Sequence, residues 1–366
     1  MNQSKAVVPL KGEVVSLDAE GLAPQETPWE EFLRVFTKDY QALFGFWVLV
    51  FLLLMALAGK AFTEWWVIFD PEVVRLTDKF LPPLSVPSPD SIQEDWPFGG
   101  IYILGTDELG RDVFARMFQG SFVSLSIGFV AVGISLGIGI LLGGLAGYYG
   151  QDKVSLKTVL VGILLAGVLI YFKWNFLAYT IIAMVALTWA FQLSVDTLIM
   201  RFTDAMMCFP TFFLILTAVA LLPPSIYTIM IIIGLFSWMG MARFVRAEFM
   251  SIREQDYVTA AKALGIPEGR IIFRHMVPNA LAPVFVSATI GVASAILTES
   301  GLSFLGFGVP PPYATWGNIL SDGKGFVFDA PWLFFIPGLA IFMVVLAFNL
   351  VGEGLREALN PKLRSR

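Results

Sequence analysis

The sequence contains one cysteine, Cys208, and one histidine, His275, among its 366 residues. A single cysteine excludes a disulfide bond within the chain, a cysteine-based metal cluster and a CxxC redox motif. We expect a structural role for His275 rather than metal binding, and Cys208 is expected to be a small packing residue at a helix entry. The sequence therefore predicts no metal or other cofactor bound by this chain.

Motifs of nucleotide hydrolysis and of common enzymes are also missing. No GxxxxGK[ST] phosphate loop, HExxH zinc motif or GxSxG nucleophile turn occurs in the sequence. The chain is predicted to hydrolyse no ATP by itself. One histidine and one cysteine do not supply the reactive set of a membrane-embedded enzyme, so the chain is predicted not to be an enzyme.

Charged residues are scarce, at 14% of the chain, whereas 57% of residues are apolar and the mean hydropathy is +0.74. A soluble domain carries less apolar sequence and interrupts it with charge. The composition predicts a polytopic, all-α membrane protein. A net charge of −5, with no basic patch interleaved with aromatic residues, argues against nucleic-acid binding.

Eight apolar runs are each about long enough to cross a bilayer as a helix. They lie near 41–58, 121–147, 156–172, 176–192, 205–222, 226–242, 281–298 and 332–351. Glycines four apart between Gly133 and Gly147 predict the close approach of a neighbouring helix. The runs hold almost no ionisable residue and show no inverted repeat, which argues against a secondary carrier or channel, the alternative from another functional class.

The N-terminal 40 residues are predicted to form a tail and an amphipathic helix on the membrane surface. Thr27, Pro28 and Glu30 make a helix start. The apolar face of this helix is predicted to contain Trp29, Phe32, Leu33, Phe36 and Tyr40. The alternative is the first helix of a small soluble cap.

The distribution of lysine and arginine predicts the orientation of the chain. Basic residues gather in the N-terminal segment, in 243–278 and in the C-terminal tail 352–366. Because basic loops stay on the cytoplasmic side, these segments are predicted to be cytoplasmic. The transmembrane domain is then 41–351, with the acidic loop 59–120 and the loop 299–331 on the outside.

The loop 243–278 is polar, charged and helix-prone between two long apolar runs. Asp256 to Leu264 is predicted to form a short helix that Gly265 ends in a left-handed conformation. Pro267 is predicted to start a second helical piece that leads to Pro278. The small residues Ala260 and Ala261 would let the first helix sit deep in a groove of another protein.

This loop resembles the "EAA" loop of ABC importer permeases, in which a Glu-Ala-Ala triplet is followed by Gly and then by Leu-Pro. The triplet here is Thr259-Ala260-Ala261, the glycine is Gly265, and the closing pair is Val277-Pro278. Thr259 replaces the glutamate, and His275 replaces the usual isoleucine. The resemblance implies that an ATPase subunit is contacted by Asp256, Tyr257, Ala260, Ala261, Leu264, Gly265 and Pro278.

Three further segments resemble the C-type permease subunit of dipeptide, oligopeptide and nickel ABC importers. They are Leu104–Ala115 (LGTDELGRDVFA), Leu302–Leu320 (LSFLGFGVPPPYATWGNIL) and the C-terminal Val351–Pro361. The resemblance covers 30–150 and 195–362. The candidates for an outer gate or for docking are Asp107, Arg111, Asp112, Phe304, Phe307 and Trp316.

Each of these outer segments has a local interpretation. Thr106 to Glu108 is expected to cap a short amphipathic helix. Arg111 and Asp112 are expected to pair with each other or to contact a docking protein, the alternative being an ordinary solvated pair. An apolar outer loop that either closes a gate or covers helix ends is expected to be formed by Phe304, Leu305, Phe307 and Trp316.

The resemblance implies the fold of a type I ABC importer transmembrane domain, with both termini cytoplasmic. Six core helices and a two-helix insertion at 151–194, predicted to be a peripheral hairpin facing lipid, make eight spans. The implied partners are a homologous permease subunit, two cytoplasmic ATPase subunits that bind ATP and Mg, and an external substrate-binding protein. The implied function is peptide import across the inner membrane of a bacterium, with nickel or another small solute as the alternative cargo.

Overall fold

The computed structural model describes residues 28–66, 70–89, 97–150, 179, 181–182 and 194–359. Within these ranges every named element is a helix, and pairing between extended segments is limited to isolated bridges. The long helices are α2 (Tyr40–Lys60), α3 (Val113–Tyr149), α8 (Ile226–Arg253), α11 (Val277–Phe304) and α13 (Trp332–Leu359). The shorter ones are α1 (Pro28–Lys38), α6 (Val195–Met207), α7 (Thr211–Leu221), α9 (Asp256–Ala263), α10 (Glu268–Arg270) and α12 (Trp316–Gly323).

Five helical stretches in the described ranges are long and apolar enough to cross a membrane. They are Tyr40–Trp65, Val113–Tyr149, Ile226–Arg253, Glu268–Phe304 and Trp332–Leu359. The runs expected at 156–172 and 176–192 lie outside the described residues, apart from Tyr179, Ile181 and Ile182, which are helical. The structure is therefore the all-helical membrane protein that the composition predicts.

The run expected as one helix at 205–222 is split. α6 ends at Met207, α7 begins at Thr211, and the two helices are bent by 78° relative to each other. Pro210 lies in the break, where its ring and its missing N–H group disfavour a continuous helix. Taken together the pair has the composition of a sixth span.

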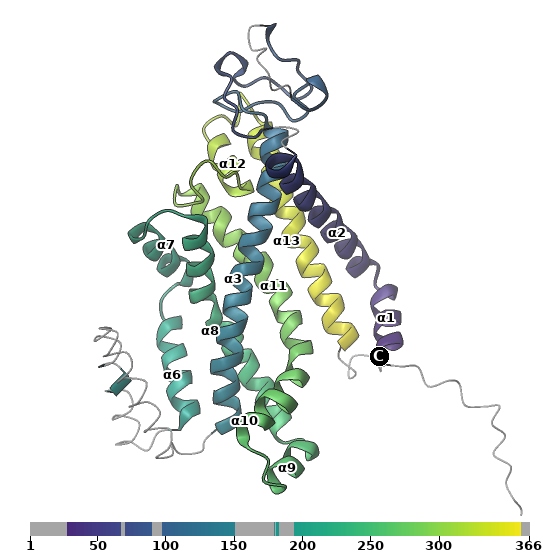
Figure 1. Ribbon diagram of the computed structural model, residues 1–366, viewed down its shortest axis with the longest axis vertical. Coiled ribbons are helices and arrows are strands. Elements are labelled where there is room, and N and C mark those ends of the chain that lie inside the picture. The colour runs from purple at the N-terminus through teal and green to yellow at the C-terminus, as the bar shows by residue number, and fades with distance from the viewer. Residues whose placement is uncertain are drawn as a thin grey trace, which may run out of the picture.

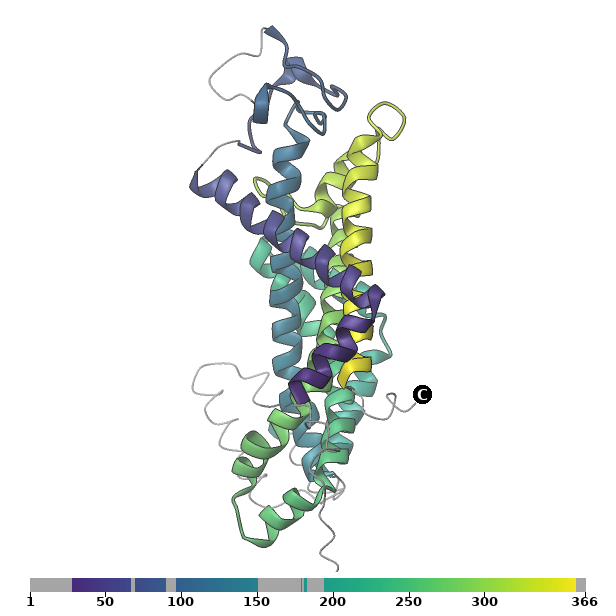
Figure 2. The same ribbon diagram turned by 90° about the vertical axis from the view of Figure 1, so that its right-hand side faces the viewer.

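The long helices form an elongated bundle with different structures at its two ends (Figure 1). One end carries α12 and the irregular segment before α3, and the opposite end carries α9 and α10 (Figures 1 and 2). α3 runs along most of the bundle between these ends (Figure 1). The two ends of the bundle are therefore connected by long helices.

The amphipathic helix α1 begins where the sequence predicts but ends at Lys38. Asp39 caps α2, because its Oδ1 atom accepts hydrogen bonds from the backbone nitrogens of Gln41, at 2.9 Å, and Ala42, at 3.3 Å. Tyr40 therefore belongs to α2, and its placement on the face of the first helix was wrong. α1 and α2 both pack against α13.

Glycines bring α3 and α8 together. A Cβ atom added at Gly139 would lie 2.5 Å from Met241 Cγ, and one added at Gly147 would lie 2.5 Å from Phe249 Cβ. An added Cβ at Gly143 would overlap the backbone of Ala242. The predicted close approach is confirmed for these three glycines. At Gly133 and Gly137 an added Cβ would have no neighbour within 4 Å among the described residues, so no described helix approaches there.

Candidate functional site

Residues 254–270, which we call the tip loop, form the end of the bundle that carries α9 and α10. Gly265 ends the α9 turn with a positive φ of 70°. Its nitrogen donates a hydrogen bond to Lys262 O, and Ile266 N donates one to Ala261 O. The predicted helix with a glycine stop is confirmed, because this backbone conformation is favourable only for a residue without a Cβ atom.

Burial divides the predicted contact residues of the tip loop into two groups. Asp256, Tyr257, Ala260, Leu264 and Gly265 are exposed, with Leu264 at 79%. Pro278, in the first turn of α11, is also exposed. These side chains are accessible to another protein.

Ala261 belongs to the other group, because it is 5% exposed and lies in the apolar core. Val258, three residues earlier on the same helical face, is fully buried. Ala261 therefore faces the interior of this chain, and its contact with an ATPase subunit stays a prediction. Its small size lets α9 pack against its own subunit.

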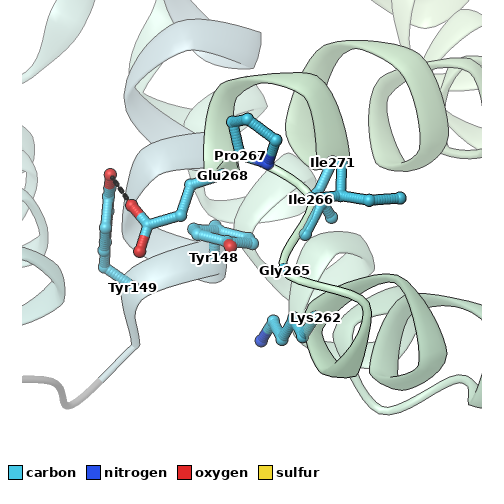
Figure 3. Close-up of a pocket in the computed structure, with 8 residues that line it drawn as sticks. All are labelled: Tyr148, Tyr149, Lys262, Gly265, Ile266, Pro267, Glu268 and Ile271. Atoms are coloured by element: carbon cyan, nitrogen blue, oxygen red, sulfur yellow. Dashed lines mark hydrogen bonds between the residues drawn. The ribbon is translucent and has the colours of Figure 1, made fainter.

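A cavity of about 590 Å³ lies between the tip loop and the end of α3 (Figure 3). It is lined by Tyr148, Tyr149, Lys262, Gly265, Ile266, Pro267, Glu268 and Ile271. Tyr149 donates its hydroxyl hydrogen to Glu268 Oε2 across 2.9 Å. The Lys262 ammonium lies 5.0 Å from the centroid of the Tyr148 ring, a distance at which a cation is attracted to an aromatic face.

The two tyrosines connect α3 to the tip loop, and the sequence pattern did not indicate them. Arg253, at the end of α8, contacts the same end of α3 by donating from Nη1 to Tyr148 O at 3.1 Å. The only signal in the sequence was the position of Tyr148 and Tyr149 at the end of a glycine-rich apolar run.

The opposite end of the bundle carries a lobe made of residues 70–89 and 97–112. Asp107 is fully buried in it and accepts four hydrogen bonds. Its Oδ1 atom accepts from the backbone nitrogens of Leu109 and Arg111, both at 2.9 Å. Its Oδ2 atom accepts from Arg111 Nε at 2.7 Å and from Arg116 Nη1 at 2.6 Å. Arg111 thus pairs with Asp107, and the expected pairing with Asp112 was wrong.

Asp112, rather than the segment from Thr106 to Glu108, caps a helix here. Its Oδ1 atom accepts from Phe114 N at 2.9 Å, and α3 begins at Val113. Its Oδ2 atom is buried without a hydrogen-bond partner among the described residues. Burial raises the pKa of Asp112 to about 6, although hydrogen bonds from the backbone of Phe114 and Ala115 and the charge of Arg75 oppose this shift.

α12 is fixed to the bundle through its first residues. Thr315 and Asn318 form a reciprocal capping box at its start. Trp316 is fully buried, its backbone nitrogen donates to Ser124 Oγ at 3.1 Å, and its indole Nε1 donates to Met117 O at 3.3 Å. Trp316 is therefore a packing residue, whereas Phe304 and Phe307 remain 40% exposed.

Glu299 anchors the same segment from α11. It is fully buried, and its Oε1 atom accepts hydrogen bonds from Ser303 Oγ at 2.7 Å and Thr315 Oγ1 at 2.8 Å. The sequence indicated only an acidic residue at a span end. Its partner Thr315 is too distant in sequence for a local pattern to reveal.

Between the two ends, α3, α8 and α11 form an uncharged groove of about 410 Å³. Its polar lining is made of the hydroxyl groups of Ser135, Ser237, Ser287, Ser294 and Thr298. Gly240 also lines it, and within the described part of the chain a Cβ added there would have no neighbour within 4 Å. No group of three or more His, Cys, Asp or Glu side chains in the described part of the chain is placed to hold a metal ion.

Two family models match the chain. Residues 180–365 match the model described as binding-protein-dependent transport system inner membrane component. Residues 27–83 match the model described as the N-terminal TM domain of oligopeptide transport permease C.

Curated relatives align with nearly the whole chain. The dipeptide transport system permease protein DppC of Alkalihalophilus pseudofirmus is 34% identical over 93% of this chain and 91% of its own length. DppC of Haemophilus influenzae is 35% identical over 93% of this chain and 96% of its own length. The oligopeptide transport system permease protein OppC of Bacillus subtilis is 30% identical over 95% of this chain and 94% of its own length.

Among solved structures, a chain of the MetNI methionine ABC transporter in an inward-facing conformation is similar over 64% of this chain and 94% of its own length. The identity is 14% and the TM-score is 0.39, which is too low to support a structural argument. The family assignment therefore depends on the sequence matches and on the apolar helices. On these grounds, the chain belongs to the family of binding-protein-dependent transport system inner membrane components and is a multi-pass protein of the bacterial inner membrane.

Proposed function

We propose that this chain is the permease subunit of an ATP-driven peptide importer and forms half of its translocation path. The observation that carries this proposal is the alignment of 93% of the chain with named dipeptide permeases at 34% and 35% identity. The chain would move solute without making or breaking a covalent bond. ATP and Mg would be bound by two separate cytoplasmic ATPase subunits.

The tip loop is the proposed contact with an ATPase subunit. It lies at one end of the bundle, and its outward side chains include Tyr257, Ala260 and Leu264. Small and apolar exposed residues on a short helix suit insertion into a groove of a partner. The basic residues of 243–278 support a cytoplasmic position for this end.

The lobe and α12, at the other end, would then face the outside and a substrate-binding protein. Phe304 and Phe307 offer exposed apolar surface there, and Arg111 is partly exposed. The buried Asp107, Asp112 and Trp316 would hold the shape of this end rather than touch the docking protein. A homologous permease subunit would complete the path.

The full topology in this proposal has eight spans and cytoplasmic termini. The five long stretches and the bent α6–α7 pair supply six of them. The remaining two are the sequence-based hairpin at 151–194, which we place at the periphery in lipid. The groove lined by serine and threonine hydroxyls is the proposed surface of the path, because uncharged hydroxyls can hydrogen-bond a peptide main chain without holding it tightly.

Uptake by cells that lack and regain this gene tests the proposed function. Cells expressing the chain with its partner subunits should accumulate a labelled di- or oligopeptide, and deletion of the gene should abolish this uptake. Labelled nickel should show no dependence on the gene. Gene-dependent nickel uptake without peptide uptake would overturn the assignment of the cargo.

A further inference from the structure

The segment Ala314–Trp316, which leads into α12, is bonded to two different long helices. From α3, Gln119 Oε1 accepts from Ala314 N at 2.9 Å, and Ser124 Oγ accepts from Trp316 N at 3.1 Å. From α11, Glu299 Oε1 accepts from Thr315 Oγ1 at 2.8 Å. Because these partners lie on two different helices, the hydrogen bonds that hold Ala314–Trp316 require α3 and α11 to keep their relative position at this end.

The same two helices are joined again at the tip-loop end. Glu268 begins the stretch that continues through α10 and a π-helical turn, Ile271–Met276, into α11. Tyr149 is the last residue of α3, and its hydroxyl group donates to Glu268 Oε2 at 2.9 Å. Figure 3 shows this bond at the edge of the cavity between the two elements. This solvent-exposed hydrogen bond joins the end of α3 to the start of the α11 stretch, in addition to the direct packing of α3 on α11 elsewhere in the bundle.

α3 is suited to transmit a displacement over this distance, whereas α11 contains an internal proline, Pro283. α3 has 37 residues, which corresponds to about 55 Å at the rise of an α-helix. It contains no proline, and Gly139, Gly143 and Gly147 pack it closely on α8. The π-helical turn at the base of α11 is a local departure from α-helical geometry, of the kind often found at functional sites.

We infer that Tyr149 is a positioning residue: through Glu268 it holds α3 in register with α11 and thereby keeps α12 seated at the other end. A partner that moves the tip loop would strain this contact and loosen the bonds of Ala314–Trp316. This inference deepens the proposed function, on which it rests for the identity of that partner. Tyr149 lies at the tip-loop end of the bundle, whereas its effect is measured on α12 at the opposite end (Figure 1).

A cysteine reporter on α12 tests the inference. Ser321, on α12, is partly exposed, so Ser321→Cys in a Cys208→Ser background should react slowly with a membrane-impermeant maleimide in membranes that contain the full complex. Phe328→Cys, at a fully exposed position, reports that the reagent reaches this end. The measured quantity is the labelling rate of Ser321→Cys divided by that of Phe328→Cys.

Tyr149→Phe and Glu268→Ala should each raise this ratio about threefold, the effect of losing one hydrogen bond. Glu268→Gln should stay near the wild-type value, because its amide oxygen still accepts the bond from Tyr149. The double variant Tyr149→Phe/Glu268→Ala should show no further increase, since both changes remove one contact. Tyr227→Phe, which removes an exposed hydroxyl at the start of α8, is the matched control.

Three results would overturn the inference. They are a ratio for Tyr149→Phe equal to that for Tyr227→Phe, effects of Tyr149→Phe and Glu268→Ala that multiply in the double variant, and a Glu268→Gln variant as reactive as Glu268→Ala. The labelling needs no transport of any solute. A shift in the labelling ratio without peptide uptake would therefore retain the inference and reject the proposed cargo. Peptide uptake without a shift in the labelling ratio would retain the proposed cargo and reject the inference.

Discussion

Arg116 donates a hydrogen bond from Nη1 to Oδ2 of Asp107 across 2.6 Å, and their side chains are 6% and 0% exposed. The same arginine reaches Asp322 on α12 at 3.1 Å. This buried ion pair therefore connects the lobe, the start of α3 and α12. A charge buried in this way is costly unless its partner is present.

Asp107→Ala should lower the free energy of unfolding by about 3 kcal/mol or more, because Arg116 would stay buried without its main counter-charge. The matched control is Glu64→Ala, which removes the exposed pair with Lys60 and should cost less than about 1 kcal/mol. Thermal unfolding of the purified complex measures both. Equal shifts in the unfolding midpoint of the two variants would show that the buried pair stabilises the protein no more than the exposed pair does.

Gly143→Ala should destabilise the protein by about 2 kcal/mol, because the new Cβ overlaps the backbone of Ala242 and α3 must move away from α8. Gly137→Ala, on the same helix, places its Cβ in open space and should be neutral or stabilising by up to about 1 kcal/mol. The midpoint of thermal unfolding distinguishes them. The packing of α3 on α8 would be refuted by a Gly143→Ala variant as stable as Gly137→Ala.

Ala260→Trp should block binding of the ATPase subunit without harming the fold, because Ala260 is exposed on α9. Ala261→Trp should instead destabilise the tip loop, since a large ring cannot fit at a position that is 5% exposed. Copurification of the ATPase subunit, together with resistance of the tip loop to protease, measures the two effects separately. A protease-resistant Ala261→Trp variant would contradict the inward packing of this residue.

The stability of the lobe should decrease as pH rises from about 4 to about 7. Burial raises the folded-state pKa of Asp112 to about 6 from an ordinary value of 3.8, so the fold favours the protonated form. The stabilisation is fully present below the ordinary pKa and is lost as pH passes through the folded-state pKa. The loss should be on the order of 3 kcal/mol at pH 7.

Asp112→Asn should remove this pH dependence, because the amide oxygen can still accept from Phe114 N and carries no charge. Asp39→Asn, a change at the cap of α2, serves as the matched control. Unfolding midpoints between pH 4 and pH 7 provide the measurement. A slope that survives in Asp112→Asn would assign the pH dependence to other groups.

Local sequence signals predicted the elements whose causes are local. The apolar runs became α2, α3, α8, α11 and α13, and Gly265 ended α9 as expected. The glycine spacing predicted the α3–α8 contact but not which glycines face it. A four-residue spacing fits two faces of a long helix, so Gly133 and Gly137 matched the pattern without meeting a neighbour.

Contacts between distant segments could not be predicted in this way. Arg116 and Asp322 are 206 residues apart, and Trp316 is 192 residues from Ser124. Polar and aromatic residues in loops look exposed in a sequence, because only the folded chain supplies the partners that bury them. For this reason Asp107 and Trp316 were expected on the surface, and Tyr149 and Glu299 were not recognised.

ATP-dependent uptake of a labelled peptide by proteoliposomes tests most directly the central claim, that this chain is a permease subunit driven by separate ATPases. The complete complex with its binding protein should accumulate peptide only with ATP. Omission of this chain, or the Ala260→Trp variant, should reduce uptake to background. ATP hydrolysis by the purified chain alone, or unchanged peptide uptake when the chain is omitted, would contradict the claim.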